Sequence, residues 1–424
     1  MPVVFFVLIF VCALAVMLVN FSAITVGLAC ITLLLPVVIR KPHLFFYAFV
    51  LTRPMLDIFV QQRSGGINLA AYATLALLAV CSRVFFSAPT RRRIRESPLL
   101  LRFNVLFGVF LLLSLVSVTR TQSISVSAAD FMRLVSLGMC FNYCALYFSE
   151  RREALTLLIV MLLSSLAPLG LGLWQFFAGT GMYDGGFNRI QAAFIHPAVF
   201  SQFLAVIFLI GMYLLVSYRP VRWPRYLLIL LMAGVFVELM MTSARTAWIA
   251  LLAAVLLFAI VRTRLSGKVR NLAVVLLIIL VIMPAVQARF SDLQGRRESS
   301  WKWRLRQWER NAHSITESPV IGQGLGMYEQ RFRFMAHNDY LRIAFETGYA
   351  GLSAYCGVMF MLFAWSLRRA LTCKPESEAA RYKIAVSLMT FLLITSIADN
   401  LVRSTVIILY IFMALGTLLG RDTA

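Results

Sequence analysis

His337 stands directly before a predicted helix, in the stretch MAHNDYLRIAFETGYAGL. An imidazole titrates near neutral pH, so this side chain can act as a base, as a metal ligand or as neither. Asn338 or Asp339 can cap the helix that follows. With about 100° of rotation per residue, Asp339, Arg342 and Glu346 lie on one face of that helix. Charged groups that enter a membrane are costly and usually line a cavity, so this polar stripe indicates a functional site.

Three other turns carry polar side chains that can bind an anion. Arg245 lies in MMTSARTAW, Arg189 lies in YDGGFNRIQAAFIHP with His196 seven residues later, and Asp399 lies in SIADNLVRS. Arginine can hold a diphosphate through forked, charge-assisted hydrogen bonds. Interfacial ion pairs and snorkelling side chains also explain any one of these positions. The recurrence of all of them at one predicted depth favours a shared site.

The elements that must position these residues are apolar helices. Of the 424 residues, 61% are hydrophobic and 14% are charged, and the mean hydropathy is +0.83, whereas soluble domains are about 45–50% apolar and about 25% charged. We therefore predict an all-α polytopic membrane protein whose first apolar segment is a span and not a cleaved leader. We expect about 12 (12–14) transmembrane helices and one large outer loop that contains helices. The candidate spans are 2–19, 22–39, 43–60, 67–86, 99–118, 131–148, 154–177, 192–217, 226–241, 245–262, 271–288, 341–366, 384–398 and 402–419.

Lys and Arg in the short loops set the predicted orientation. Most of the 40 basic residues fall in one set of loops, such as RRRIRE at 91–96 and RTRLSGKVR at 262–270, which we place in the cytoplasm with both termini. Residues 1–288 then form an N-terminal transmembrane bundle, 289–340 a large helical, basic outer loop that carries the candidate catalytic His337, and 341–424 the C-terminal helices of the same membrane domain. The net charge of +22 predicts contact with anionic membrane lipids. Outside the cytoplasm, an anionic lipid or a phosphorylated glycan is the expected partner, and nucleic acid is not.

The long outer loop contains a predicted helix from Ser299 or Ser300 to about Ile315. This helix suits either the membrane surface or the outer face of the protein itself. The glycines of SPVIGQGLGMY do not match GxGxxG, so we expect tight turns near the membrane in place of a nucleotide-binding loop. The apolar face of the helix is predicted to comprise Trp301, Leu305, Trp308 and Ala312, with Arg304, Arg306 and Arg310 elsewhere around it.

The sequence lacks the spacing of a metal site or of a disulfide framework. Its seven cysteines include no CxxC pair, and its four histidines are scattered. It contains no DxD pair that would hold Mg²⁺. We expect Cys140 and Cys144 to be buried thiols, and we expect no metal and no cofactor.

Three motifs resemble those of the O-antigen ligase and polymerase superfamily. SPVIGQGLGMY followed by AHNDYLRIAFETGYAGL resembles its outer-loop signature, in which a proline-glycine segment precedes a histidine and a GxxG-like end. MMTSARTAW resembles its arginine motif, which follows the ninth or tenth span. NRIQAAFIHPAVFSQFLA is similar to its GxFxxPNxxA motif but departs from it, because Ala193 stands for the usual glycine and His196, Pro197 and Ala198 replace the usual residues.

The resemblance implies an inner-membrane glycosyltransferase that moves a glycan from undecaprenyl diphosphate to an acceptor on the periplasmic side. Such an enzyme must hold the diphosphate, stabilise its growing charge and activate an acceptor hydroxyl. Arg189 and Arg245 suit the first two tasks, and His337 suits the third as general base. The supporting polar residues, which can orient the imidazole or an arginine, are Asp339, Asp399, Glu346 and His196.

Several acceptors are compatible with the sequence. The basic outer loop favours a sugar hydroxyl of lipid A-core, which corresponds to a metal-independent O-antigen ligase in lipopolysaccharide maturation. An O-antigen polymerase is the alternative. A protein O-oligosaccharyltransferase usually has an extra soluble C-terminal portion, whereas this sequence ends at Ala424, just after the last predicted span. In a different class, a transporter of an anionic lipid would be supported by broken helices and internal repeats, and no clear repeat is visible.

Overall fold

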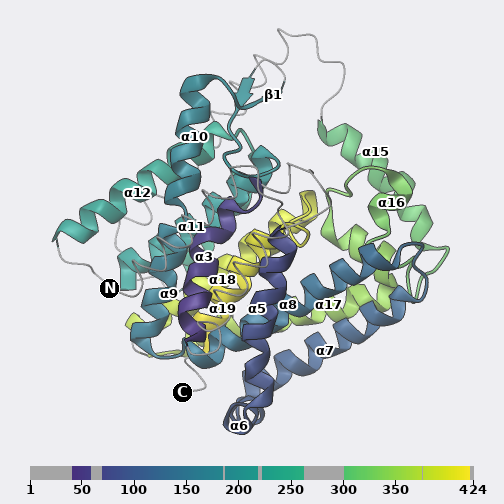
Figure 1. The fold of residues 1–424 in the computed structure, drawn as a ribbon, viewed down its shortest axis with the longest axis horizontal. Helices are drawn as coiled ribbons and strands as arrows, with labels where there is room; N and C mark the ends of the chain where they lie inside the picture. The colour runs from purple at the N-terminus through teal and green to yellow at the C-terminus, as the bar shows by residue number, and fades with distance from the viewer. Residues whose placement is uncertain are drawn as a thin grey trace, which may run out of the picture.

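The chain is a bundle of apolar helices in the computed structural model, which describes residues 41–58, 69–184, 187–217, 222–261, 300–374 and 376–420 (Figure 1). Seven helices in these ranges are long and apolar enough to cross a membrane, or eight if the bent pair that meets at Ser87 is counted as one span. The predicted all-α polytopic membrane class is therefore confirmed. The predicted spans 2–19, 22–39 and 271–288 lie outside the described residues, so the expected number of about 12 stays a prediction.

The elements follow one another as helices, apart from one short hairpin. In chain order they are α3 (Pro42–Thr52), η1 (Arg53–Met55), α5 (Leu69–Phe86), α6 (Ala88–Glu96), α7 (Pro98–Val118), α8 (Ile124–Tyr147), α9 (Arg151–Leu163), α10 (Leu166–Ala178), β1 (Met182–Asp184), β2 (Phe187–Arg189), α11 (Pro197–Ser217), α12 (Arg222–Met241), α13 (Arg245–Ile260), α15 (Ser300–Ala312), η2 (His313–Ile315), α16 (Tyr328–Phe332), α17 (Asp339–Thr372), α18 (Glu376–Ala398) and α19 (Thr405–Leu419).

Several predicted spans differ in length from the helices. The segment predicted at 43–60 stays helical only to Thr52 and then tightens into the 3₁₀ turn η1, where Arg53 Nη1 lies 2.7 Å from Asp57 Oδ1. A proline directly after Arg53 removes a backbone donor, which explains why the α-helix ends there. The last predicted span becomes α19, which has 15 residues and is shorter than a membrane is thick.

The centre of the bundle is formed by α11 and α19, whose residues are almost all buried. α19 packs closely on α8, because a Cβ atom on Gly416 would lie 2.4 Å from the carbonyl oxygen of Phe141. Small residues at such contacts let helix backbones approach each other in a membrane. The buried thiols predicted for Cys140 and Cys144 are confirmed, and both face this interior.

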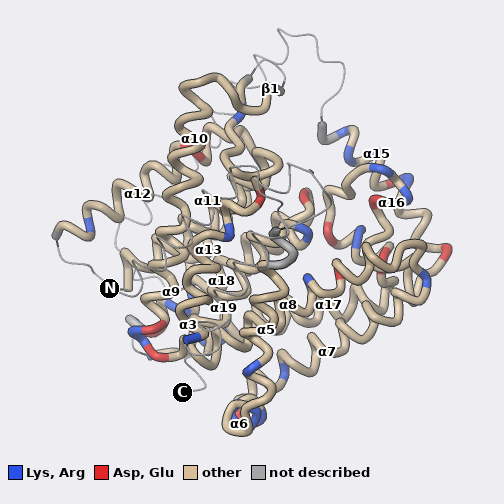
Figure 2. The backbone as a smooth tube through the Cα atoms, in the orientation of Figure 1, with Lys and Arg blue, Asp and Glu red and all other residues tan. Residues whose placement is uncertain are grey.

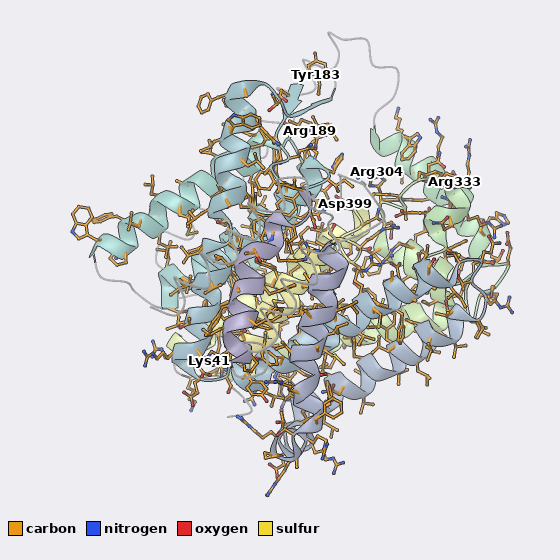
Figure 3. The ribbon with its side chains drawn as sticks, in the orientation of Figure 1. Lys41, Tyr183, Arg189, Arg304, Arg333 and Asp399 are labelled. Atoms are coloured by element: carbon orange, nitrogen blue, oxygen red, sulfur yellow. The ribbon has the colours of Figure 1, made fainter. Side chains whose placement is uncertain are left out.

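Charged groups gather at the two ends of the bundle. The basic helix α6 lies at the lower end in Figure 2, far from α15 and α16. Lys41 lies at that same lower end in Figure 3, whereas Arg189, Arg304 and Asp399 lie together at the upper end. Lys41 and α6, both predicted to be cytoplasmic, thus lie at the opposite end of the bundle from the predicted site residues Arg189 and Asp399.

The helix that follows His337 is broken after two and a half turns. Within α17, Gly348 has φ 69° and ψ −179°, a conformation that is essentially restricted to glycine. The break also admits a neighbouring chain segment, since a Cβ atom on Gly348 would lie 2.2 Å from the carbonyl oxygen of Val320. At the other end of this short helical piece, the side chain of Asn338 accepts a 2.9 Å hydrogen bond from Leu341 N, as expected of a cap.

The glycine-rich loop 319–326 satisfies the carbonyl groups that the break exposes. Gln323 N donates to Phe345 O at 2.8 Å, and Gly324 N donates to Glu346 O at 3.2 Å. The predicted tight turns are present, because φ is positive at Gly322, Gly324 and Gly326, with values of 83°, 109° and 76°. Loop and broken helix form one unit in which unpaired backbone groups are supplied with partners, as a membrane environment demands.

We predict that Gly348→Ala lowers the thermal stability of the purified protein, because the substitution forces an alanine into a glycine conformation and into contact with Val320 O. The expected cost is about 2 kcal/mol or more. Gly357→Ala is the matched control, since Gly357 lies on the same helix with no neighbouring atom within 4 Å of its added Cβ. That control should leave the melting temperature unchanged or raise it. Equal melting temperatures for both variants would contradict the assigned role of the break.

Candidate active site

His337 is held in an unusual backbone conformation at the top of α17. Its φ is 48°, in the left-handed region that side chains other than glycine rarely adopt. The residue before it is fixed by α15, because Trp308 Nε1 donates a 2.8 Å hydrogen bond to Ala336 O. The His337 side chain remains 26% exposed. The imidazole is therefore positioned by its neighbours and still reachable from outside.

The carboxylate closest to His337 belongs to Asp399, in the turn between α18 and α19. His337 Nδ1 lies 3.5 Å from Asp399 Oδ1, which is at the long limit for a hydrogen bond. Catalytic hydrogen bonds are often this long without substrate. With Nδ1 facing Asp399, Nε2 on the far side of the ring is the atom that can accept a proton.

Asp399 is itself fixed by neighbours from other elements. Gln202 Nε2 of α11 donates to its Oδ2 at 2.7 Å, and Asn400 N donates to its Oδ1 at 2.9 Å. Burial raises the pKa of Asp399, but the contact with His337, the Asn400 N–H group and the charge of Arg304 outweigh it and hold the pKa below the ordinary 3.8. Asp399 is therefore an anion at neutral pH, suited to orient an imidazole and to stabilise its protonated form.

Arg304 was not among the predicted site residues, yet the structure places it at this site. Its Nη1 donates a 2.6 Å hydrogen bond to Ala398 O, next to Asp399. Burial and the nearby charge of Arg189 lower the pKa of Arg304, and Asp399 opposes this shift. Figure 3 shows Arg189, Arg304 and Asp399 side by side. Spacing within α15 offered no signal for Arg304, because its hydrogen-bond partner, Ala398 O, lies 94 residues further along the chain.

α15 packs through a different face from the one predicted. Leu305 is 44% exposed and Ala312 is exposed, whereas Arg304, Trp308 and Asn311 face the protein. The inward residues hydrogen-bond to other elements, including a 2.6 Å bond from Asn311 Nδ2 to the Tyr328 hydroxyl. The predicted apolar face is therefore wrong, because polar contacts and not apolar burial seat this helix. α15 contacts other elements at the outer face of the protein, as one of the two predicted settings expects, and the membrane surface stays a prediction.

Arg189 is held at the end of β2 and is linked to the turn that carries Arg245. Its Nε donates a 2.8 Å hydrogen bond to Thr242 O, in the turn between α12 and α13. Arg245 is the first residue of α13 and is exposed. The buried Gln175 of α10 fixes the loop after Arg189, because its side-chain oxygen accepts hydrogen bonds from Gln191 N and Ala192 N at 3.1 and 2.8 Å. Arg189 thus connects the Arg245 turn to the His337 side of the site.

His196 lies beside the same loop but serves its own helix. Its Nδ1 accepts a 3.0 Å hydrogen bond from Ala198 N, so the imidazole caps α11. The cap sets the start of the helix whose next turn carries Gln202, the partner of Asp399. His196 is therefore linked to the site through α11.

Three of the predicted site loops contain strained backbone. Among the described residues, four that are not glycine have positive φ, and three of them are Ala192 (49°), Ser243 (53°) and His337 (48°). These positions belong to the loops of Arg189, Arg245 and His337. When Phe194 and Pro197 are matched to GxFxxP, the glycine falls on Ala192 and not on Ala193, which corrects the earlier placement. Strain of this kind persists where the surroundings enforce it and concentrates at functional sites.

Asp339 and Glu346 belong to a separate, buried ion cluster centred on Arg342. Arg342 Nε lies 3.7 Å from Asp339 Oδ1, and Arg342 Nη1 lies 3.6 Å from Glu346 Oε2. Asp130 of α8 is 3.9 Å from Arg342 and 3.0 Å from Arg133. The predicted polar stripe is therefore present, but its members pair with one another. Of the three carboxylates considered as partners of His337, the structure brings Asp399 to it.

The described residues contain no group of three or more His, Cys, Asp and Glu side chains that could hold a metal ion.

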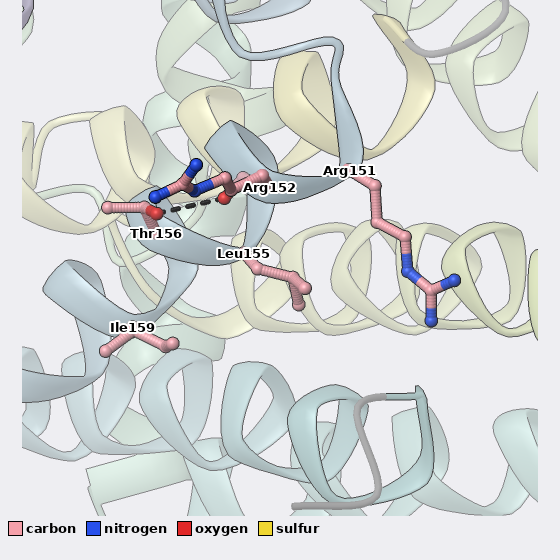
Figure 4. A pocket seen from close by; sticks show the side chains of 5 residues that line it. All are labelled: Arg151, Arg152, Leu155, Thr156 and Ile159. Carbon is pink, nitrogen blue, oxygen red and sulfur yellow. Dashed lines mark hydrogen bonds between the residues drawn. The ribbon is translucent and has the colours of Figure 1, made fainter.

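A recess occurs on α9, lined by Arg151, Arg152 and Leu155 together with Thr156 and Ile159 (Figure 4). α9 lies well away from α15 (Figure 1), so this recess is separate from the His337 site. Two arginines above apolar side chains at a helix start suit lipid headgroups.

An imidazole, a fixed carboxylate and several arginines lie together at one end of the apolar helices. Residues 230–356 match the O-antigen ligase family. The resemblance predicted from the motifs is confirmed over this segment, which runs from α12 to α17 and includes Arg245 and His337. A search of curated proteins finds no match. Arg189 and Asp399 lie outside the matched segment in the sequence, and the fold places both of them next to it.

We predict that Asp399→Asn lowers the rate of glycan transfer by about 100-fold, because the variant loses the charge that orients and stabilises the imidazole. Turnover of the purified variant measures this effect. In a His337→Ala background the same substitution should cost little more, since the two residues act as a unit. Fully multiplicative losses in that double-mutant cycle would contradict the pairing.

We further predict that Ala192→Gly raises the melting temperature, because glycine adopts the observed positive φ without strain and relieves about 1 kcal/mol. Ala193→Gly is the matched control. Ala193 is also buried but has no positive φ, so its replacement should lower the melting temperature. The same sign for both variants would argue against strain at Ala192.

Proposed function

We propose that the protein is a glycosyltransferase of the bacterial inner membrane. In this proposal it transfers an O-antigen glycan from undecaprenyl diphosphate to a sugar hydroxyl of lipid A-core, on the periplasmic side. The observation that carries the proposal is the His337–Asp399 pair, which lies beside Arg304 and Arg189 in a chain whose central segment matches the O-antigen ligase family. A base and a set of cations at one membrane face are what transfer from a lipid diphosphate needs.

In the proposed reaction His337 Nε2 takes the proton of the acceptor hydroxyl. The hydroxyl oxygen forms a bond to the first carbon of the donor glycan, and the bond from that carbon to the diphosphate oxygen breaks. Undecaprenyl diphosphate leaves with the electron pair, and the proton stays on His337 until solvent removes it. Asp399 stabilises the imidazolium that forms, because it is already charged and fixed by Gln202 and Asn400.

The arginines are proposed to hold the diphosphate and to stabilise the charge that grows on it. Arg189 and Arg245 come from two loops that a hydrogen bond joins, so they can act on the same group. Arg304 completes the set from the side of α15. Guanidinium groups grip phosphate oxygens in pairs and can neutralise a diphosphate without a metal ion. The proposed mechanism is therefore metal-independent.

The acceptor is proposed to be lipid A-core because the outer helix is basic. α15 contains Lys302, Arg304, Arg306 and Arg310 against one acidic residue, Glu309. Such a surface attracts a phosphorylated glycan more than a neutral one. This charge favours a ligase over an O-antigen polymerase, which would accept the end of another repeat unit.

The test combines purified protein with undecaprenyl-diphosphate glycan and offers either lipid A-core or a second donor molecule as acceptor. We predict transfer to lipid A-core, with the rate of the His337→Ala variant lower by at least about 100-fold. Donor binding to that variant should be unchanged, because the imidazole acts on the acceptor. Growth of the glycan on a second donor would instead identify a polymerase, and normal turnover by His337→Ala would refute the base.

The metal-independent mechanism is examined in the same assay. Protein treated with EDTA should transfer glycan at an undiminished rate, since arginines neutralise the diphosphate. Loss of activity on chelation, with recovery after Mg²⁺ is added, would refute this part of the proposal.

Arg245→Ala should weaken donor binding and turnover, whereas Arg306→Ala, on the exposed side of α15, should leave donor affinity unchanged.

A further inference from the structure

An aromatic side chain beside His337 has no part in the mechanism above. We propose that Trp303 is the platform on which the acceptor sugar stacks, so that its hydroxyl group meets His337. This inference rests on the proposed function, because it identifies the acceptor as the sugar held near the base. It adds a binding residue in α15 to the charged groups already described.

The geometry places Trp303 directly against the imidazole. The ring centroids of Trp303 and His337 are 6.4 Å apart with an interplanar angle of 73°. Trp303 also meets Phe334, with centroids 5.7 Å apart and an angle of 66°. Both contacts are edge-to-face, which fixes the orientation of the indole.

Two tryptophans of α15 have different settings, and the difference argues for a ligand. Trp308 is turned inward and uses its N–H group to hold Ala336 O. Trp303 is 37% exposed, although it is fixed in place by two rings. A large apolar ring kept open beside a polar, partly exposed imidazole offers a surface for a partner that has both apolar and polar faces.

A sugar ring is such a partner. Its C–H groups form an apolar face that can lie on the electron-rich face of an indole, while its hydroxyl groups point outward to polar side chains. The exposed face of α15 suits a sugar that bears phosphate, because Arg306 and Arg310 follow Trp303 at helical spacings of three and seven residues and both are exposed. A ring on Trp303 thus has a base at one edge and cations along the helix.

A membrane contact is the competing explanation for an exposed tryptophan near an interface. The mixed setting of Trp303 favours the sugar, since it has both the apolar ring of Phe334 and the polar ring of His337 as neighbours, on a helix that carries exposed arginines. A membrane anchor needs no sugar, whereas a stacking platform places a sugar on the aromatic face. Binding of an oligosaccharide without its lipid therefore distinguishes the two explanations.

The experiment measures binding of the core oligosaccharide without its lipid to the full-length protein in nanodiscs, by calorimetry and by saturation-transfer NMR. We expect Trp303→Leu to weaken binding by about tenfold and Trp303→Phe to retain it within about threefold. Leu305→Ala is the matched control, because Leu305 lies on the same helix and is 44% exposed. In transfer assays Trp303→Leu should raise KM for the acceptor about tenfold with little change in kcat and none in KM for the donor.

Equal binding by wild-type protein and Trp303→Leu would overturn the inference, and so would an equal loss in Leu305→Ala. Melting temperatures of all variants, together with recovery in Trp303→Phe, separate a binding defect from a folding defect. Failure of the proposed function has a different signature. If the wild-type protein bound the oligosaccharide through Trp303 but transferred no glycan, the transferase proposal would fail and the platform would stand.

Discussion

The need to satisfy backbone groups where α17 breaks is the constraint on which the site depends. A helix interruption near a membrane exposes carbonyl groups that lipid cannot hydrogen-bond. Here the loop 319–326 supplies N–H groups to Phe345 O and Glu346 O, and Gly348 provides the space for that loop. The short helical piece above the break is consequently fixed at both ends, by this loop and by the Asn338 cap. Because His337 directly precedes that cap, the position of the imidazole follows from the way the break is sealed.

The same principle explains why the other site loops tolerate strain. The loop of Arg189 is clasped by Gln175, a buried side chain that uses both ends of its amide on Gln191 and Ala192. Arg189 in turn binds Thr242 O, next to the strained Ser243. Each positive φ costs about 1–3 kcal/mol, so it persists only where several bonds enforce it. The strained loops hold side chains from distant parts of the chain together at one end of the bundle.

Features that depend on nearby residues were predictable from the sequence. The Asn338 cap, the stripe of Asp339, Arg342 and Glu346, and the extent of α15 all follow from local spacing, and the structure shows each of them. The packed face of α15 was not predictable in this way. Arg304 and Trp308 face inward because they donate hydrogen bonds to Ala398 O and Ala336 O, which lie outside α15 in the sequence.

The choice of Asp399 as the partner of His337 has the same origin. Three carboxylates had suitable spacing, and the sequence alone left them equal. In the fold their partners differ. Asp339 and Glu346 pair with Arg342, whereas Asp399, in the turn after α18, lies next to the imidazole. Such a choice depends on contacts between helices, which spacing along one helix does not encode.

Arg342 and Arg304 differ in the charges that surround them. Arg342 lies within 4 Å of three carboxylates, those of Asp130, Asp339 and Glu346, so its charge is matched inside the protein. Breaking a matched, buried set of this kind destabilises a fold strongly, which marks it as structural. Arg304 differs, since burial and Arg189 disfavour its charge more than Asp399 supports it, and its pKa is lowered as a result. An anion that bound beside Arg304 would relieve that imbalance, as the diphosphate of the proposed donor would. The charge of Arg304 is therefore less fully matched within the protein than that of Arg342.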